Sequence, residues 1–112
     1  MSDCIFCKII NKEIPAKIIY EDTNVIAFND INPQAINHIL IVPKKHEQDI
    51  ENIKDPEIYE HLLNAAIKIS KELNISGSGY RLCLNTGPDA GQTVQHVHMH
   101  LLGGQRLSDK MA

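Results

Sequence analysis

The sequence predicts an α+β fold in which two helices pack against an antiparallel sheet of about five strands. Two observations carry this prediction. Short segments rich in β-branched or alternating apolar residues occupy positions 18–20, 25–29, 39–43, 80–85 and part of 91–104. Two other segments, 4–11 and 55–73, carry apolar residues at the three- and four-residue spacing of an amphipathic helix.

Length and charge narrow the class of protein. The chain has 112 residues, within the range of about 100 to 150 that is the commonest domain size, so residues 1–112 are expected to form one domain. Its 11 basic and 14 acidic residues include no run that would follow a nucleic-acid backbone. The N-terminus lacks a signal-peptide core, and no apolar run approaches the ~20 residues that cross a bilayer. We expect a soluble cytoplasmic protein, with or without a nuclear pool, that binds neither nucleic acid nor membrane.

The first predicted helix spans residues 4–11, with Asp3 as its N-cap. Within it, Cys4 and Cys7 are three positions apart and therefore face the same side. With Cys83 they make three cysteines, which are too few and of the wrong parity for a disulfide scaffold. The pair is interpreted either as half of a zinc site, which would need two further ligands, or as two small packed thiols.

The next two strands, 18–20 and 25–29, are predicted to pair as a β-hairpin, and a third strand follows at 39–43. A loop, D-I-N-P-Q-A, connects the second strand to the third, which His38 precedes. The Asp30 carboxylate in this loop has two interpretations. It either caps the turn or accepts hydrogen bonds from vicinal hydroxyls, as acidic residues do with a ribose.

The longest helix is predicted to begin with Asp55 as N-cap and Pro56 at its first position. Its apolar stripe consists of Ile58, Leu62, Ala65, Ala66, Ile69 and Leu73. We interpret the helix as a packing element of the core or of a subunit interface. Because so short a chain buries only about two-thirds of its unfolded surface, we expect a homodimer with this helix and the strand at 80–85 in the interface.

The C-terminal third contains the residues that suggest chemistry. The strand at 80–85, whose Cys83 is interpreted as a packed thiol, leads into T-G-P-D-A-G-Q at 86–92. Small residues in such a turn let a ligand approach backbone N–H groups, which can hold phosphate oxygens. The segment 91–104 then alternates three histidines with apolar residues, which predicts a strand with all three imidazoles on one face.

Three chemistries compete for His96, His98 and His100. A zinc site built from these three alone is disfavoured, because strand residues two apart are separated by about 6 to 7 Å. A general-base role needs a serine or cysteine nucleophile beside it, and no G-x-S-x-G motif is present. The third chemistry makes the central histidine a nucleophile toward phosphorus, with another histidine donating to phosphoryl oxygens.

The motif H-V-H-M-H-L-L, preceded by G-Q-T-V, resembles the signature of the histidine triad (HIT) superfamily of nucleotide hydrolases and transferases. The segments I-P-A-K-I-I-Y-E-D, F-N-D-I-N-P-Q-A and H-I-L-I-V-P-K-K-H are similar to the histidine triad nucleotide-binding (Hint) branch. The resemblance implies one HIT domain, a homodimer, and hydrolysis of purine nucleoside phosphoramidates of the AMP-amine or AMP-lysine type. The implied ligand is a purine nucleotide such as AMP or GMP.

Carried over residue by residue, the resemblance implies that His98 forms a nucleotidyl-histidine intermediate and that His100 binds phosphate oxygens. It makes His96 and His38 the residues that orient the reactive ring. The implied substrate-binding residues are Asp30 at the ribose, Ile5, Phe6, Ile9, Phe28 and Ile31 at the purine, and Asn85, Gly91, Gln92 and Thr93 at the phosphate and leaving group.

Two further expectations follow from the resemblance. Catalysis is expected to need no cofactor, and zinc-bearing relatives imply a structural zinc on Cys4, Cys7, His46 and His96, which competes with the interpretation as packed thiols. Two alternative functions stay open. One is hydrolysis of diadenosine polyphosphates, and the other is a nucleotide- or zinc-binding interaction protein whose catalysis is vestigial.

Overall fold

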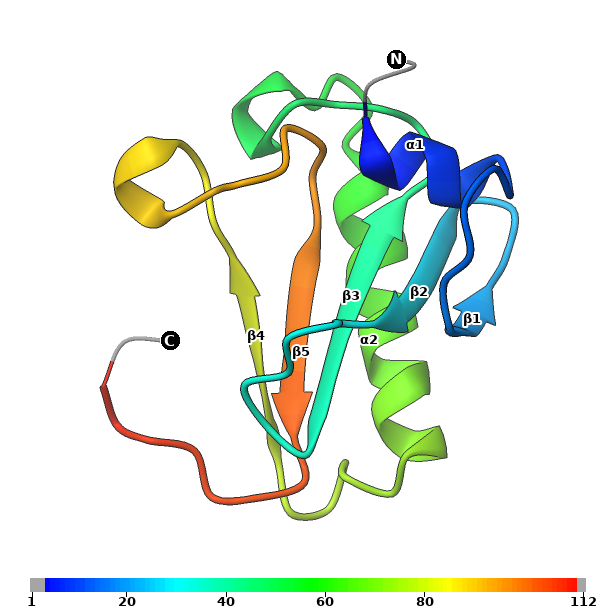
Figure 1. The fold of residues 1–112 in the computed structure, drawn as a ribbon. Helices are drawn as coiled ribbons and strands as arrows, with labels where there is room; N and C mark the ends of the chain where they lie inside the picture. Colours follow the sequence, from blue (N-terminus) through cyan, green and yellow to red (C-terminus); the bar gives the residue numbers. More distant parts are fainter. Residues whose placement is uncertain (1–3, 111–112) are drawn as a thin grey trace.

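The computed structural model, which describes residues 4–110, contains an antiparallel five-stranded sheet with the order β1-β2-β3-β5-β4 (Figure 1). The strands are β1 (Ile18–Glu21), β2 (Val25–Asn29), β3 (Asn37–Pro43), β4 (Tyr80–Leu84) and β5 (Met99–Gly103). The predicted α+β class, the hairpin and the positions of the first four strands are confirmed. The sheet leaves β1 and β4 at its edges.

The strand expected within 91–104 is shorter than predicted, because β5 begins only at Met99. The backbone N–H of Val97 donates to the carbonyl of Glu47, 2.8 Å away in a loop, rather than to a neighbouring strand. His96 and His98 therefore lie in the loop that leads into β5, and only His100 of the three lies within the strand.

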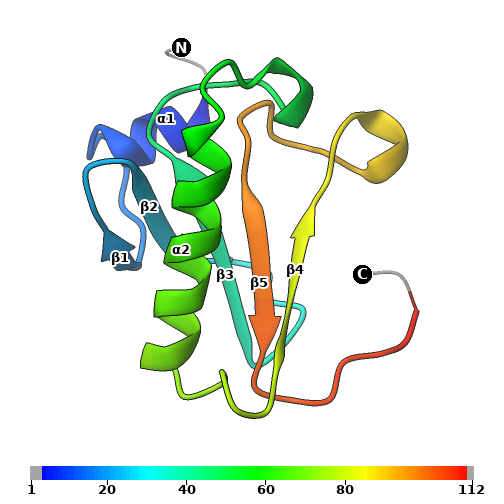
Figure 2. The same ribbon diagram turned by 180° about the vertical axis from the view of Figure 1, so that it is seen from behind.

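The two helices lie on opposite faces of the sheet, as the two views in Figures 1 and 2 show. Helix α1 (Ile5–Ile10) covers one face and packs Phe6 and Ile9 against residues of β2 and β3. Helix α2 (Glu57–Glu72) covers the other face. Successive side chains of β3 point to opposite faces of the sheet. Ile39 and Ile41 belong to the hydrophobic cluster that includes α2, and Leu40 and Val42 belong to the cluster that includes Phe6 and Ile9 of α1.

Both helices form where the sequence predicts them. The Asp55 carboxylate accepts from the backbone N–H of Glu57 at 3.0 Å, and five residues of the predicted apolar stripe are buried, while Leu73 is half-buried. At α1 the Cys4 sulfur accepts from the N–H of Cys7 at 3.4 Å, whereas Asp3, the predicted cap, lies outside the described residues. Two 3₁₀ helices, Ile50–Asn52 and Pro88–Ala90, were not predicted. Among residues 4–110, no helix is both long and apolar enough to cross a membrane.

Strand pairing places the chemically distinctive side chains on the α1 face of the sheet. His100 pairs with Leu40 of β3 on one side and with Cys83 of β4 on the other. His38 lies on β3 two positions from Leu40, so its ring is a diagonal neighbour of His100 on the same face. The register thus gathers two histidines that are 62 positions apart in the chain.

Candidate active site

His98 is held by its own loop. It is buried, and its Nδ1 lies 2.8 Å from the carbonyl oxygen of His96. A carbonyl can only accept a hydrogen bond, so Nδ1 carries the hydrogen, and the neutral ring keeps a lone pair on Nε2. The ring centroids of His98 and His100 are 5.1 Å apart. The loop therefore presents a nucleophilic ring nitrogen beside a second imidazole.

A hydrogen-bond relay fixes the tautomer of His100. The backbone N–H of Gln34 donates to His38 Nδ1 at 2.9 Å, so neutral His38 carries its hydrogen on Nε2. That nitrogen lies 2.9 Å from His100 Nδ1, which accepts, and His100 is left with its hydrogen on Nε2. The Asp30 carboxylate is 3.4 Å from His38 Nε2 and also accepts from the backbone N–H of Asn32. His100 thus has a donor N–H available for a ligand.

Burial keeps these rings neutral. Desolvation, together with the smaller effects of the neighbouring His98 and His38, lowers the pKa of His100 to about 4, against a small opposing effect of the Asp30 charge. Burial also lowers the pKa of His38, although the charge of Asp30 opposes this shift. Near pH 7 the relay consequently consists of neutral imidazoles with defined donors and acceptors.

His96 faces a different group of residues. It is fully buried, and its Nε2 donates to the carbonyl of Pro43 at 2.8 Å, which leaves the Nδ1 lone pair free. That Nδ1 lies 3.4 Å from the Cys4 sulfur, 3.7 Å from the Cys7 sulfur and 3.1 Å from Nδ1 of His46. Cys7 Sγ and His46 Nδ1 are 3.2 Å apart. The four atoms converge on one point, as the predicted zinc ligands would have to.

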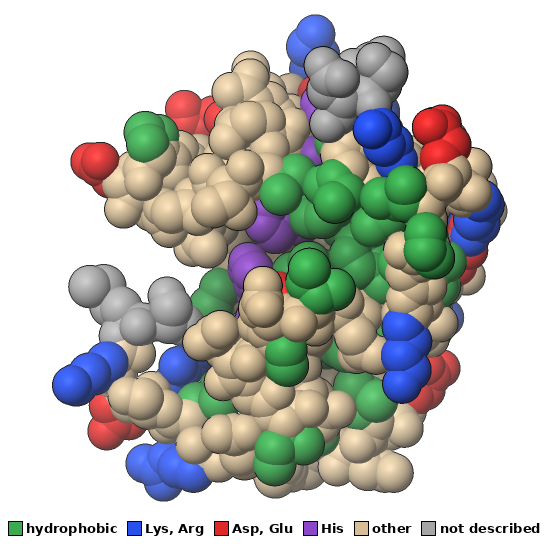
Figure 3. All heavy atoms as spheres, viewed as in Figure 1, with side chains coloured by type: hydrophobic (Ala, Val, Ile, Leu, Met, Phe, Trp, Pro, Cys, Tyr) green, Lys and Arg blue, Asp and Glu red, His purple; other side chains and the backbone are tan. Residues whose placement is uncertain are grey.

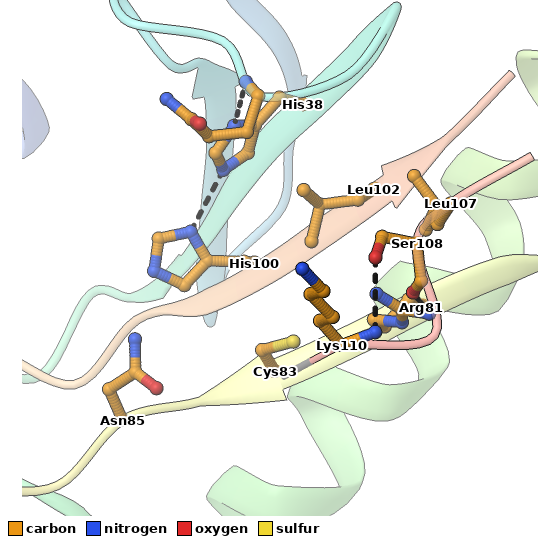
Figure 4. Close-up of a pocket in the computed structure, with 10 residues that line it drawn as sticks. His38, Arg81, Cys83, Asn85, His100, Leu102, Leu107, Ser108 and Lys110 are labelled. Carbon is orange, nitrogen blue, oxygen red and sulfur yellow. Dashed lines mark hydrogen bonds between the residues drawn. The ribbon is translucent and has the colours of Figure 1, made fainter. Parts of the chain in front are cut away.

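A cavity of about 330 Å³ opens beside His100 (Figure 4). His38 and His100 form one end, and Arg81, Cys83 and Asn85 line the side along β4. The C-terminal segment that includes Leu107, Ser108 and Lys110 forms the remaining wall. Of the four residues expected at the phosphate and leaving group, Asn85 is the one that lines this space.

The other three residues of that group belong to the loop before β5. Gln92 is buried, and its amide group bonds three backbone groups, the N–H of Gly87 and the carbonyls of Gln48 and Val94. The side chain of Gln92 therefore stabilises the loop in this structure. Gly91 has φ 81°, a conformation that favours glycine, and Thr93 is exposed.

The residues expected around the purine lie on the α1 side of the histidines. Phe6 meets the His98 ring edge-on at 5.1 Å, and Phe6, Ile9 and Phe28 form part of one buried cluster. Ile31 is 91% exposed and Ile5 is 48% exposed, so these two side chains are free to contact a ligand. Figure 3 shows hydrophobic side chains gathered beside the surface histidines in this region.

Sequence reasoning missed several groups that shape the site. The N–H of Gln34 and the carbonyl of Pro43 are backbone atoms, and no residue type signals their roles. Arg81 and Lys110 line the cavity but were not predicted. Arg81 carried a usable signal, since it shares strand parity with Cys83 and Asn85.

Comparison with known proteins agrees with this geometry. The HIT domain family model matches residues 11–107. The purine nucleoside phosphoramidase of Escherichia coli K12 is 42% identical over 112 residues, which covers 98% of this chain and 94% of that protein. A crystal structure of a HIT family hydrolase from Legionella pneumophila has a TM-score of 0.91 and 44% identity, covering 95% of this chain and 96% of that one.

A histidine triad protein from Clostridium difficile, with a structure at 0.95 Å resolution, is also similar. It has a TM-score of 0.95 and 46% identity, and the match covers 99% of this chain and 98% of that chain. Fold, sequence and the arrangement of the histidines therefore lead to one conclusion: the chain belongs to the HIT domain family.

Proposed function

We propose that the protein hydrolyses purine nucleoside phosphoramidates, in which AMP or GMP is joined to an amine, through a nucleotidyl intermediate on His98. The observation that carries this proposal is that His98 has a lone pair on Nε2 next to His100, which has an N–H on its Nε2. In each ring a hydrogen bond at Nδ1 fixes this state, to the carbonyl of His96 for His98 and from His38 for His100. Similarity to the Escherichia coli purine nucleoside phosphoramidase supports the substrate class.

The reaction divides into two displacements at phosphorus. First, His98 Nε2 attacks the α-phosphorus, the bond from phosphorus to the amine nitrogen breaks, and the amine leaves after its nitrogen takes up a proton from solvent. His100 donates its Nε2 hydrogen to a phosphoryl oxygen and stabilises the charge that develops there. Second, a water oxygen attacks the same phosphorus, the P–N bond to His98 breaks, and the nucleotide leaves while a proton passes to solvent.

The nucleoside is proposed to lie on the α1 side of His98. There the exposed side chains of Ile5 and Ile31 would flank the purine, and the half-buried Asp30 would accept hydrogen bonds from the ribose hydroxyls. Phe6, Ile9 and Phe28 would form the apolar base beneath the purine. Asn85 would contact the leaving group from β4, because it lines the cavity next to His100.

The two alternative functions make different demands on the site. A diadenosine polyphosphate hydrolase would use the same nucleophile and differ only in its leaving group, so kcat/KM for diadenosine polyphosphates relative to AMP-amines discriminates the two. An interaction protein with vestigial catalysis would bind nucleotides without turnover. The fixed tautomers of His98 and His100 favour an enzyme over that second alternative.

We also propose that Cys4, Cys7, His46 and His96 hold one structural zinc ion. A tetrahedral zinc with Zn–N and Zn–S bonds of about 2.0 and 2.3 Å has ligand atoms about 3.3 to 3.8 Å apart. Four of the six separations between the ligand atoms here lie between 3.1 and 3.7 Å, which suits that geometry, and all six lie within 4.8 Å. The bond from His96 to Pro43 leaves Nδ1 free, as metal-ligating histidines require. Such an ion would join α1 to the loop that carries His98.

We further propose a homodimer. The outer face of α2 exposes an apolar stripe of Tyr59, Leu63 and Ile67, which are 39%, 47% and 45% exposed and lie four positions apart. Edge strand β4 adds Leu84, which is 36% exposed, near the same face of the sheet. Burying these side chains against a second copy would remove apolar surface from water.

Replacing His98 by Asn tests the nucleophile. The variant should bind AMP within a few-fold of the wild-type affinity but lose turnover of an AMP phosphoramidate by about 10⁴ or more, at least ~5 kcal/mol of barrier. His61→Asn, on α2 at the opposite face, serves as the control and should keep full activity. Steady-state kinetics and calorimetry measure both. Activity of His98→Asn within tenfold of the wild type would refute the assignment.

Stability against pH tests the neutral state of His100. Its pKa is about 4 in the folded protein, below the ordinary value of 6.5, so between these pH values the unfolded chain binds more protons. Stability should therefore fall as the pH drops from 6.5 toward 4. Thermal melts should show a shallower fall for His100→Gln than for the wild type. An unchanged slope in His100→Gln would contradict the proposed neutral state.

Elemental analysis of protein purified without chelator tests the zinc proposal. We expect about one zinc per chain, and loss of zinc with a lower melting temperature in Cys4→Ser, because a closed site contributes to folding. Cys83→Ser, outside the cluster, should retain the metal. Less than about a tenth of an equivalent of zinc, with an unchanged melting temperature in Cys4→Ser, would show that the cysteines are packed thiols.

Light scattering at micromolar concentration tests the dimer. Two copies of the 12.6 kDa chain should give a particle of about 25 kDa. Leu63→Asp should shift the mass toward the monomer by placing a charge in the interface, and Asn64→Asp, on the neighbouring exposed position of α2, should not. A wild-type particle of 12.6 kDa would overturn the proposal.

A further inference from the structure

We propose that the cavity beside His100 binds the leaving group and selects amines that carry an anionic substituent, a carboxylate or a phosphate. This inference rests on the proposed phosphoramidate hydrolysis and adds the chemical class of the leaving amine. Arg81 and Lys110 would be the residues that determine this specificity.

The position of the cavity assigns it to the leaving group. It extends from His100 and Asn85 along β4 to the C-terminal segment, as Figure 4 shows. The proposed nucleoside site lies on the opposite side of the histidines, toward α1 and Ile31. A phosphorus atom held by His98 and His100 would therefore direct its nucleoside toward α1 and its amine toward β4. The cavity of about 330 Å³ is large enough for a group of amino-acid size.

The charge of the lining favours an anion. Arg81 and Lys110 line the cavity, and none of its lining residues in the described chain carries a carboxylate. In Figure 4 the Lys110 side chain points into the space between His100 and Cys83. Asp109 lines an adjoining hollow together with Arg81, and the Asp30 carboxylate lies 3.4 Å from His38 Nε2 at the histidine end of the cavity. The two positive charges lie at the other end, between β4 and the C-terminal segment. An ammonium group in this cavity would be repelled, whereas a carboxylate or phosphate would be attracted.

The C-terminal segment is attached to β4 by one of these two cations. Arg81 Nη2 donates to the carbonyl oxygen of Ser108 at 2.8 Å. A guanidinium has five N–H donors in a planar fork, so the bond to Ser108 leaves others for a carboxylate or phosphate. The same contact places Lys110, two residues further on, at the cavity. Arg81 therefore contributes a charge of its own and positions that of Lys110.

The test compares three adenosine 5′-phosphoramidates whose amines are β-alanine, β-alanine amide and 2-aminoethyl phosphate. The wild type should favour the two anionic amines over the neutral amide by about five- to tenfold in kcat/KM, a modest ratio because Lys110 is exposed to solvent. The preference should decrease as KCl is raised. The larger of the two anionic preferences identifies the group, carboxylate or phosphate, that the cavity fits better.

The three amines also differ in their intrinsic reactivity as leaving groups, and this difference is the same for every variant tested. Comparing variants therefore isolates the effect of the cavity's positive charges on kcat/KM. Lys110→Gln and Arg81→Gln should each lower the preference to about twofold or less, and Arg81→Lys should retain more of it than Arg81→Gln. Lys54→Gln, an exposed lysine outside the cavity lining, should keep the full preference.

Two results would overturn the inference while leaving the proposed function intact. The first is that the wild type has the same kcat/KM for all three substrates. The second is that the preference for anionic amines persists unchanged in both Lys110→Gln and Arg81→Gln. Failure of the wild type to hydrolyse any of the three substrates would instead refute the proposed function, and the inference would fall with it.

Discussion

The hydrogen bond between His98 Nδ1 and the carbonyl of His96 is the contact on which the proposed chemistry depends. It decides which nitrogen of His98 carries the hydrogen and directs the lone pair of the other toward the ligand. The carbonyl is fixed in turn, because the His96 ring is buried and donates to the carbonyl of Pro43 at the end of β3. The proposed nucleophile, His98, is thus positioned by two successive hydrogen bonds to backbone carbonyls.

His96 connects two sites that the sequence presents as separate motifs. Its backbone holds His98, while its ring Nδ1 faces the two cysteines of α1 and His46. Phe6 of α1 meets both His96 and His98 edge-on, with ring centroids 5.8 and 5.1 Å away. A metal ion at the cysteines would therefore restrain α1, the loop before β5 and the packing around His98 together. His96, which was expected to orient the proposed nucleophile, holds His98 through its backbone carbonyl, while its ring faces the proposed zinc ligands.

Periodicity and caps were sufficient to predict the fold, whereas the site depends on tertiary register. The apolar stripe of α2 is a local signal and was correct. The predicted cap was one residue early, because the helix begins at Glu57 with Pro56 as its N-cap, although the Asp55 carboxylate still accepts from the N–H of Glu57. The start of β5 was wrong because a backbone bond from Val97 to Glu47 overrides the alternation of the histidines. The contact between His38 and His100 follows from the pairing of β3 with β5, which sequence spacing does not specify. Likewise, the cavity forms because the C-terminal segment folds back onto β4. No pattern in the sequence predicts where this segment lies.

The proposed chemistry requires that hydrogen bonds fix the tautomers of His98 and His100 before any ligand binds. Nitrogen-15 NMR of the ligand-free protein at pH 7, with the histidine signals assigned by single substitutions, measures these tautomers directly. We expect His98 to carry its hydrogen on Nδ1, and His38 and His100 to carry theirs on Nε2. A spectrum in which His98 carries its hydrogen on Nε2, or in which His98 or His100 exchanges between the two tautomers, would contradict this expectation.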